Sequence, residues 1–122
     1  KTSVCSVLTA IAMLSSMQVL GADFYYRAKV ARILVSDTDY AGCMAETTPA
    51  PRAGDNRCTT KFVTFDCANL TGIGRASAAN KLSAAQLAFI TDREVGILVP
   101  ENADGTLASV DGHCLASRVD NF

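Results

Sequence analysis

The spacing of the cysteines restricts the fold of this chain more than any other feature of its sequence. Four of the five cysteines, Cys43, Cys58, Cys67 and Cys114, follow residue 22, and an even number in a short exported chain is typical of two disulfides. The alternative is a zinc site, but spacings of 15, 9 and 47 residues contain no CxxC pair and the chain has one histidine. His113 directly precedes Cys114, and neighbours on a strand point to opposite faces, which argues against a catalytic thiol.

Residues 1–22 have the layout of a secretory signal peptide. Lys1 precedes an apolar stretch over 4–14, and a Ser-rich patch leads to the small pair at 21–22. The apolar stretch is too short to span a bilayer comfortably, although a membrane anchor or a core helix is the alternative. We therefore predict a signal peptide over 1–22, one domain over 23–122, a secreted or periplasmic location and no membrane span after cleavage.

Composition narrows the class of protein further. A chain of 122 residues fits one compact domain, and 49% apolar residues are enough to build a core. Lys1 is the one charged residue before residue 23, so 23–122 holds ten basic and twelve acidic residues, a formal charge of −2. That balance argues against nucleic acid as a partner.

Alternating apolar residues and turn signals predict five strands and one helix beyond residue 22. The strands are expected at 29–35, 42–47, 60–67, 94–99 and 114–120, and the helix at 77–92 with Ser77 as its N-cap. The helix is apolar around most of its girth, so we expect it to contact its own sheet or another subunit. Five strands with a helix between strands three and four match the oligonucleotide/oligosaccharide-binding (OB) barrel. The predicted fold class is therefore mainly β (α+β): a disulfide-bonded, five-stranded OB-fold barrel.

This barrel layout selects a disulfide pairing. Cys43 opens the second strand and Cys67 closes the third, so they face each other across the base of an antiparallel hairpin. Cys58 lies just before strand three and Cys114 opens strand five, and parallel neighbours bring these two starts together. We predict Cys43–Cys67 and Cys58–Cys114. The competing pairing, Cys43–Cys58 with Cys67–Cys114, needs a start-to-end contact between parallel strands.

Several spaced features resemble the binding (B) subunits of subtilase-cytotoxin and pertussis-like bacterial toxins, and related small exported bacterial proteins. They are Tyr25 and Tyr26 followed by Val30 and Val35, then Cys43, then Cys67 before an Ala-rich helix, and the strand DREVGILV at 92–99. The similarity covers about 24–99. The ending GHCLASRVD, at 112–120, is similar to the last strands of the small exported proteins.

The resemblance implies an OB-barrel protomer that closes into a homopentamer, with the helices lining a central pore. It also implies that the outer face binds a host glycan, often a sialylated one, and that the ring carries a separate toxin A subunit. Tyr25, Tyr26 and Arg27 would form part of the glycan site, with a tyrosine ring stacking on a sugar; alternatively, the tyrosines pack against a neighbouring subunit. The toxin subunits have a serine at the position of Arg27. An arginine there can bind a glycan carboxylate in bidentate fashion, or fill the pocket and abolish binding.

The predicted function is therefore that of a ring-forming, glycan-binding subunit rather than an enzyme. The sequence has no GxSxG, HExxH, P-loop or GxGxxG motif, and we expect no cofactor and no metal. An exported protein-interaction module without glycan binding is the alternative.

Overall fold

The fold comes from a computed structural model, which describes residues 23–51, 58 and 60–122. The predicted signal peptide lies outside these residues. The elements are β1 (Phe24–Val35), the 3-10 helix η1 (Tyr40–Gly42), β2 (Cys43–Thr48), β3 (Phe62–Thr64), α2 (Arg75–Thr91), β4 (Glu94–Val99), β5 (Ser109–Val110), β6 (His113–Leu115) and β7 (Arg118–Asn121). The described chain is thus mainly β with one α-helix, as the sequence predicts.

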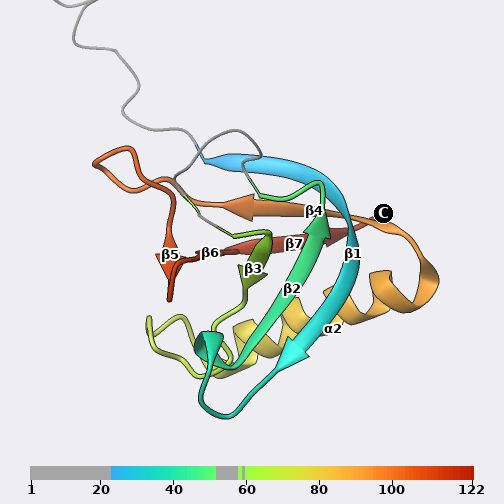
Figure 1. Ribbon diagram of the computed structural model, residues 1–122, viewed down its shortest axis with the longest axis horizontal. Helices are drawn as coiled ribbons and strands as arrows, with labels where there is room; N and C mark the ends of the chain where they lie inside the picture. The colour runs from blue at the N-terminus through green and yellow to red at the C-terminus, as the bar shows by residue number, and fades with distance from the viewer. Residues whose placement is uncertain (1–22, 52–57, 59) are drawn as a thin grey trace, which may run out of the picture.

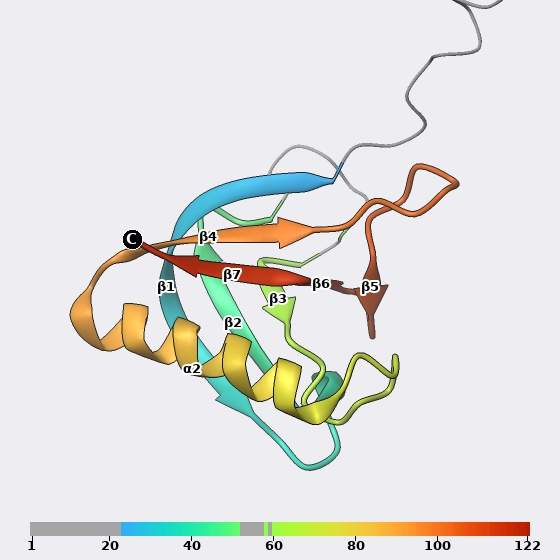
Figure 2. The same cartoon turned by 180° about the vertical axis from the view of Figure 1, so that it is seen from behind.

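The strands form one curled sheet in the hydrogen-bonded order β5-β6-β3-β2-β1-β4-β7, and α2 lies along its lower side in both views (Figure 1 and Figure 2). This is an open series of seven strands rather than the predicted five-stranded closed barrel. The predicted last strand is interrupted at Ala116 and Ser117, so it forms two short strands instead of one. Its first part, β6, pairs in parallel with β3, and β7 pairs antiparallel with β4. β5 lies between the fourth and fifth predicted strands, where no strand was expected, and pairs with β6.

β1 serves two partners and bends between them. Its first half pairs with β4 and its second half with β2, both antiparallel. The register shifts between Val30 and Arg32, which makes Ala31 an extra residue, a β-bulge. Val30 belongs to the core and Ile33 packs against it, although positions three apart on a regular strand face opposite ways. The bulge therefore keeps both halves of β1 turned toward the same core.

α2 covers the core with small side chains. Ala78, Ala85 and Ala88 are buried and Leu82 packs against the core cluster; this spacing places the four on one face of a helix. Large side chains from the sheet and from the segments next to it fill the space beneath them, with Phe65, Ile97, Leu107, Val63, Val95 and Val99 among those fully buried. Alanines on the facing helix let it lie close to this layer.

The ends of α2 differ from the prediction. Gly74 is the N-cap residue in place of Ser77, and it makes no side-chain capping hydrogen bond. At the other end Asp92 adopts the left-handed conformation, with φ of 52°, and its N–H donates to the carbonyls of Ala88 and Phe89. Such a residue ends a helix because it satisfies carbonyls of the last turn.

Both predicted disulfides are confirmed. The Cα atoms of Cys43 and Cys67 are 5.5 Å apart and those of Cys58 and Cys114 are 5.4 Å apart, which is the usual separation. The second bridge follows from the parallel pairing of β3 with β6, in which Val63 lies opposite Cys114. The competing pairing is therefore wrong. Two disulfides are compatible with a secreted or periplasmic protein.

A buried carboxylate organises the connection from β3 to α2. Asp66 is fully buried, and its oxygens accept hydrogen bonds from the N–H of Leu70 at 2.8 Å and from the N–H and hydroxyl of Thr71 at 2.8 and 2.5 Å. Burial alone would raise the pKa of Asp66, but the hydrogen bonds from Thr71 and Leu70 and the charge of Lys81 lower it overall. The ionised carboxylate thus fixes the loop that leads into α2.

Candidate binding surface

The predicted ligand-binding residues Tyr25, Tyr26 and Arg27 lie in the first half of β1 and alternate across the sheet. Tyr25 and Arg27 are exposed, whereas Tyr26 is 8% exposed and belongs to the core. Successive side chains on a strand face opposite sides. The structure therefore brings Tyr25 and Arg27 together on the outer face and places Tyr26 apart from them, inside.

Tyr26 has a structural environment. Its ring stacks on Phe24, with 5.2 Å between ring centroids. Its hydroxyl lies 2.9 Å from the Thr47 hydroxyl oxygen, which itself donates to the carbonyl of Pro49, so Tyr26 is the donor to Thr47. Desolvation raises the pKa of Tyr26 to about 12, against the opposing effect of the hydrogen bond with Thr47. Tyr26 therefore holds β1 against the core from the inside.

Tyr25 lies across β4 at a glycine. A Cβ atom at Gly96 would meet the Tyr25 hydroxyl oxygen at 1.8 Å and its Cζ at 2.6 Å, so a residue without a side chain is required beneath the ring. The hydroxyl donates to Asp120 at 3.4 Å, and the guanidinium carbon of Arg118 is 5.7 Å from the ring centroid. The ring still leaves Tyr25 41% exposed. Gly96 thus leaves the space in which the exposed ring of Tyr25 lies.

Arg27 lies beside a second exposed aromatic ring. Its guanidinium carbon is 3.9 Å from the centroid of Phe122, within cation–π range, and its nearest nitrogen is 3.7 Å from the Glu94 carboxylate. On β7, Arg118 pairs with Asp120 at 3.1 Å. We name this outer surface of β1, β4 and β7 the Tyr25 face; it consists of Tyr25, Arg27, Glu94, Gly96, Arg118, Asp120 and Phe122.

Sequence reasoning identified only two residues of the Tyr25 face. A usable signal was Gly96, because a glycine inside an apolar strand often marks the close approach of another group. Arg118 and Asp120 join the face through the register of β4 and β7, where they lie opposite Leu98 and Gly96. Register between strands distant in sequence is not encoded in a local pattern, so these two residues could not be found that way.

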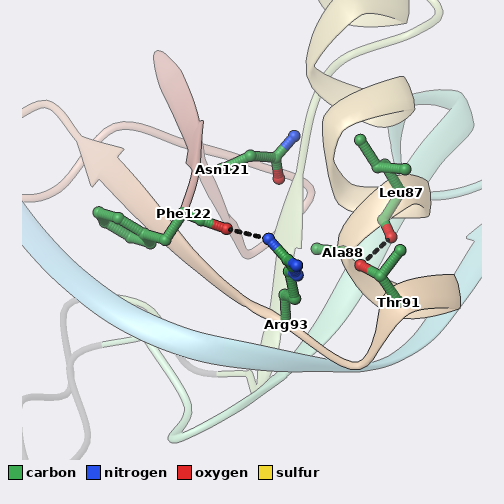
Figure 3. A pocket seen from close by; sticks show the side chains of 6 residues that line it. All are labelled: Leu87, Ala88, Thr91, Arg93, Asn121 and Phe122. Carbon is green, nitrogen blue, oxygen red and sulfur yellow. Dashed lines mark hydrogen bonds between the residues drawn. The ribbon is translucent and has the colours of Figure 1, made fainter.

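A small pocket adjoins the Tyr25 face where the end of β7 meets α2 (Figure 3). It has a volume of about 280 Å³ and is lined by Leu87, Ala88, Thr91, Arg93, Asn121 and Phe122. Arg93 donates to the Phe122 carbonyl at 3.3 Å, and the Thr91 hydroxyl donates to the Leu87 carbonyl at 2.7 Å. The volume of this pocket falls below the range of ordinary ligand pockets. We therefore describe it as the edge of the Tyr25 face and not as a separate site.

α2 turns an uncharged side to solvent. Its sequence contains two charged residues, Arg75 and Lys81, while Leu87, Phe89 and Ile90 are 55%, 48% and 79% exposed. A helix on the surface of a monomer usually carries a charged outer face, and grouped exposed apolar side chains mark interaction surfaces. This side of α2 is therefore an exposed, largely apolar surface.

Comparisons of the chain with protein-family models, curated proteins and solved structures found no match. Over residues 23–51, 58 and 60–122, no helix has the length and apolar character needed to cross a membrane. Within the same residues, no three His, Cys, Asp or Glu side chains are grouped as a metal site requires.

Proposed function

We propose that this chain is the glycan-binding subunit of an exported, ring-forming assembly, and that the Tyr25 face is its binding surface. The observation that carries the proposal is the exposed ring of Tyr25, seated over Gly96 and flanked by the guanidinium group of Arg118. A fixed aromatic ring offers a flat apolar surface on which a sugar ring can stack. Arg27, two residues along the same outer row, supplies a cation beside it.

An acidic sugar, such as a sialylated host glycan, fits the Tyr25 face through Arg27. Arg27 contacts Glu94 at 3.7 Å, near the outer limit of an ion pair, so a closer carboxylate can take over its donors in bidentate fashion. Arg118 is held at 3.1 Å by Asp120 and is less available. We therefore assign Arg27 as the group that binds the glycan carboxylate and Tyr25 as the stacking surface.

The finer fold and the assembly belong to the same proposal. The N–H of Ala116 donates to Thr64 in β3 at 3.0 Å, and the N–H of Ser117 donates to Leu98 in β4 at 2.9 Å. This continuity between β6 and β7 supports an OB-type fold with an interrupted last strand, related to the toxin B subunits. The uncharged side of α2 supports a homopentamer whose helices line a pore and carry a toxin A subunit. The disulfides support secretion or a periplasmic location.

The alternative is an exported protein-interaction module that binds no glycan. Leu87 and Ile90, exposed on the outer side of α2, favour it, because an apolar helical surface can hold another protein whether or not the Tyr25 face holds a sugar. The two functions differ in what they require of Tyr25 and Arg27.

Titration with sialyllactose, followed by calorimetry, tests the glycan proposal, with lactose as the uncharged control. Arg27→Gln should weaken sialyllactose binding about tenfold and leave lactose unchanged, whereas Tyr25→Ala should weaken both sugars. Tyr25→Phe keeps the ring and should bind as the wild type does. Arg75→Gln, at an exposed arginine on α2 outside the Tyr25 face, is the matched control.

The mass of the protein in solution tests the ring separately. A value near five protomers supports the pentamer, and a monomer contradicts it. A ring of the expected mass that binds no sugar on a glycan array would contradict the glycan proposal and favour the protein-interaction module.

A further inference from the structure

A second polar surface lies on the other half of the sheet. In the register of β1, β2 and β3, Arg32 lies opposite Glu46 and Glu46 lies opposite Phe62. His113 on β6 meets Phe62 edge to face, with 5.9 Å between ring centroids. With Lys61 these residues form what we name the Phe62 row; β1, β2 and β3 lie side by side in Figure 1. The Phe62 row shares no residue with the Tyr25 face.

One carboxylate fixes two cations in the Phe62 row. The side chain of Glu46 is 19% exposed, and its two oxygens contact Arg32 at 3.1 Å and Lys61 at 3.6 Å. Both cations remain more than half exposed, at 56% and 57%, and lie 5.5 and 5.8 Å from the centroid of Phe62. A guanidinium has five N–H donors and an ammonium three. Glu46 engages few of these donors, so the two cations can bind a further anion together.

His113 adds an oriented imidazole to this surface. Its Nδ1 lies 2.8 Å from the hydroxyl of Thr60, and the contact with Phe62 restrains the ring from the side. Because Thr60 engages Nδ1, Nε2 is the nitrogen that a ligand would meet. The Phe62 row therefore combines a half-buried aromatic ring, two cations in contact with Glu46 and an imidazole in contact with Thr60, across four adjacent strands.

We propose that the Phe62 row is a second carbohydrate site, which binds an acidic pyranose. The sulfate or carboxylate of the sugar is bound by Arg32 and Lys61, while the sugar ring packs on Phe62 and a hydroxyl meets His113. Two cations against one carboxylate give this surface a net positive charge that suits such a ligand. The inference does not rest on the Tyr25 face, because the aromatic ring and the cations are different ones.

Titration of the full, disulfide-bonded chain tests this site, observed through the backbone amide signals in NMR spectra. The probes are a heparin-derived tetrasaccharide, which carries sulfate and carboxylate, and tetragalacturonate, which carries carboxylate alone. We expect shifts centred on Lys61, Phe62 and His113. Binding of both probes identifies carboxylate as sufficient, and binding of the first alone identifies a sulfated ligand. Arg32→Gln and Lys61→Gln should each weaken binding about tenfold.

Matched controls separate this site from general charge attraction. Arg75→Gln removes an exposed guanidinium from α2, outside both the Phe62 row and the Tyr25 face, and should bind the probes as the wild type does. The proposal is overturned if neither probe binds, if Arg75→Gln weakens binding as much as Arg32→Gln, or if inorganic sulfate at equal charge displaces the tetrasaccharide. Where Arg32→Gln fails to fold, Arg32→Lys keeps the charge, loses the planar fork and should still weaken binding several-fold.

Discussion

Replacement of Asp66 by asparagine tests how the fold is held at the entrance to α2. The side chain is 0% exposed and accepts three hydrogen bonds, from Leu70 and Thr71. Asparagine has nearly the same shape and tolerates the φ of 60° found at this position, so backbone strain would not contribute. The amide nitrogen of asparagine, however, is itself a donor. It would face one or two of the N–H and O–H groups that donate to Asp66. The loss of one or two hydrogen bonds to a charged acceptor, at roughly 1.5–3 kcal/mol each, predicts a destabilisation of about 3 kcal/mol.

The pKa of Asp66 also predicts how the stability of the fold depends on pH. Its pKa is lowered in the folded protein, whereas the unfolded chain has an ordinary value of about 3.9. A carboxyl group whose folded-state pKa is depressed stabilises the fold fully above its unfolded value, and this stabilisation is lost as the pH falls through the folded-state value. The free energy of unfolding of the wild type should therefore fall below about pH 4, and Asp66→Asn should lack that part of the fall.

Urea unfolding at neutral pH and a series of thermal scans into the acid range measure both effects. Asp111→Asn is the matched control, because Asp111 also has a positive φ, 52°, but is exposed. We expect this control to change stability by less than about 0.5 kcal/mol. Equal losses for the two variants, or parallel acid curves for the wild type and Asp66→Asn, would refute the reasoning.

Three further predictions concern single sites. Gly96→Ala places a Cβ atom 1.8 Å from the Tyr25 hydroxyl, so the ring must move by roughly 2 Å; calorimetry should show weaker sialyllactose binding while the melting temperature changes little. Burial raises the pKa of Tyr26 from 10.0 to about 12. The stability that this shift contributes is fully present below the pKa of the unfolded chain and is lost as the pH rises toward the folded-state pKa. Thermal scans at alkaline pH should therefore show a smaller loss of stability for Tyr26→Phe than for the wild type. Joint replacement of Cys58 and Cys114 by serine opens a loop of sequence separation 56 and should cost about 4 kcal/mol in urea unfolding, and a loss below about 1 kcal/mol would contradict the loop-entropy argument.

Local patterns located much of the secondary structure, because apolar alternation and turn residues mark where elements begin and end. β2, β4 and α2 lie within two residues of their predicted ends. The cysteine pairing also followed from sequence, since the position of each cysteine relative to a strand end leaves few geometries open. The parallel pairing of β3 with β6 brings Cys114 opposite Val63, and so within reach of Cys58.

The remaining features depend on contacts between distant parts of the chain. β1 begins at Phe24, five residues before its predicted start, because β4 pairs with this first half. The break at Ala116 and Ser117 arises where the chain turns from β3 toward β4. Tyr25 and Asp120 meet across 95 positions. No periodicity within a short window can specify such pairs, so the sequence pattern alone does not identify the Tyr25 face.

The bulge at Ala31 explains how one strand presents both proposed sites. Arg27 and Arg32 are an odd number of positions apart, so a regular strand would send them to opposite faces. The extra residue restores their common direction: Arg27 meets Glu94 and Arg32 meets Glu46 on the outside of the sheet. On a regular strand one guanidinium would enter the core, where an unpaired charge costs several kcal/mol. The bend that wraps β1 around the core and the outward direction of two separate cationic sites therefore have a single structural cause.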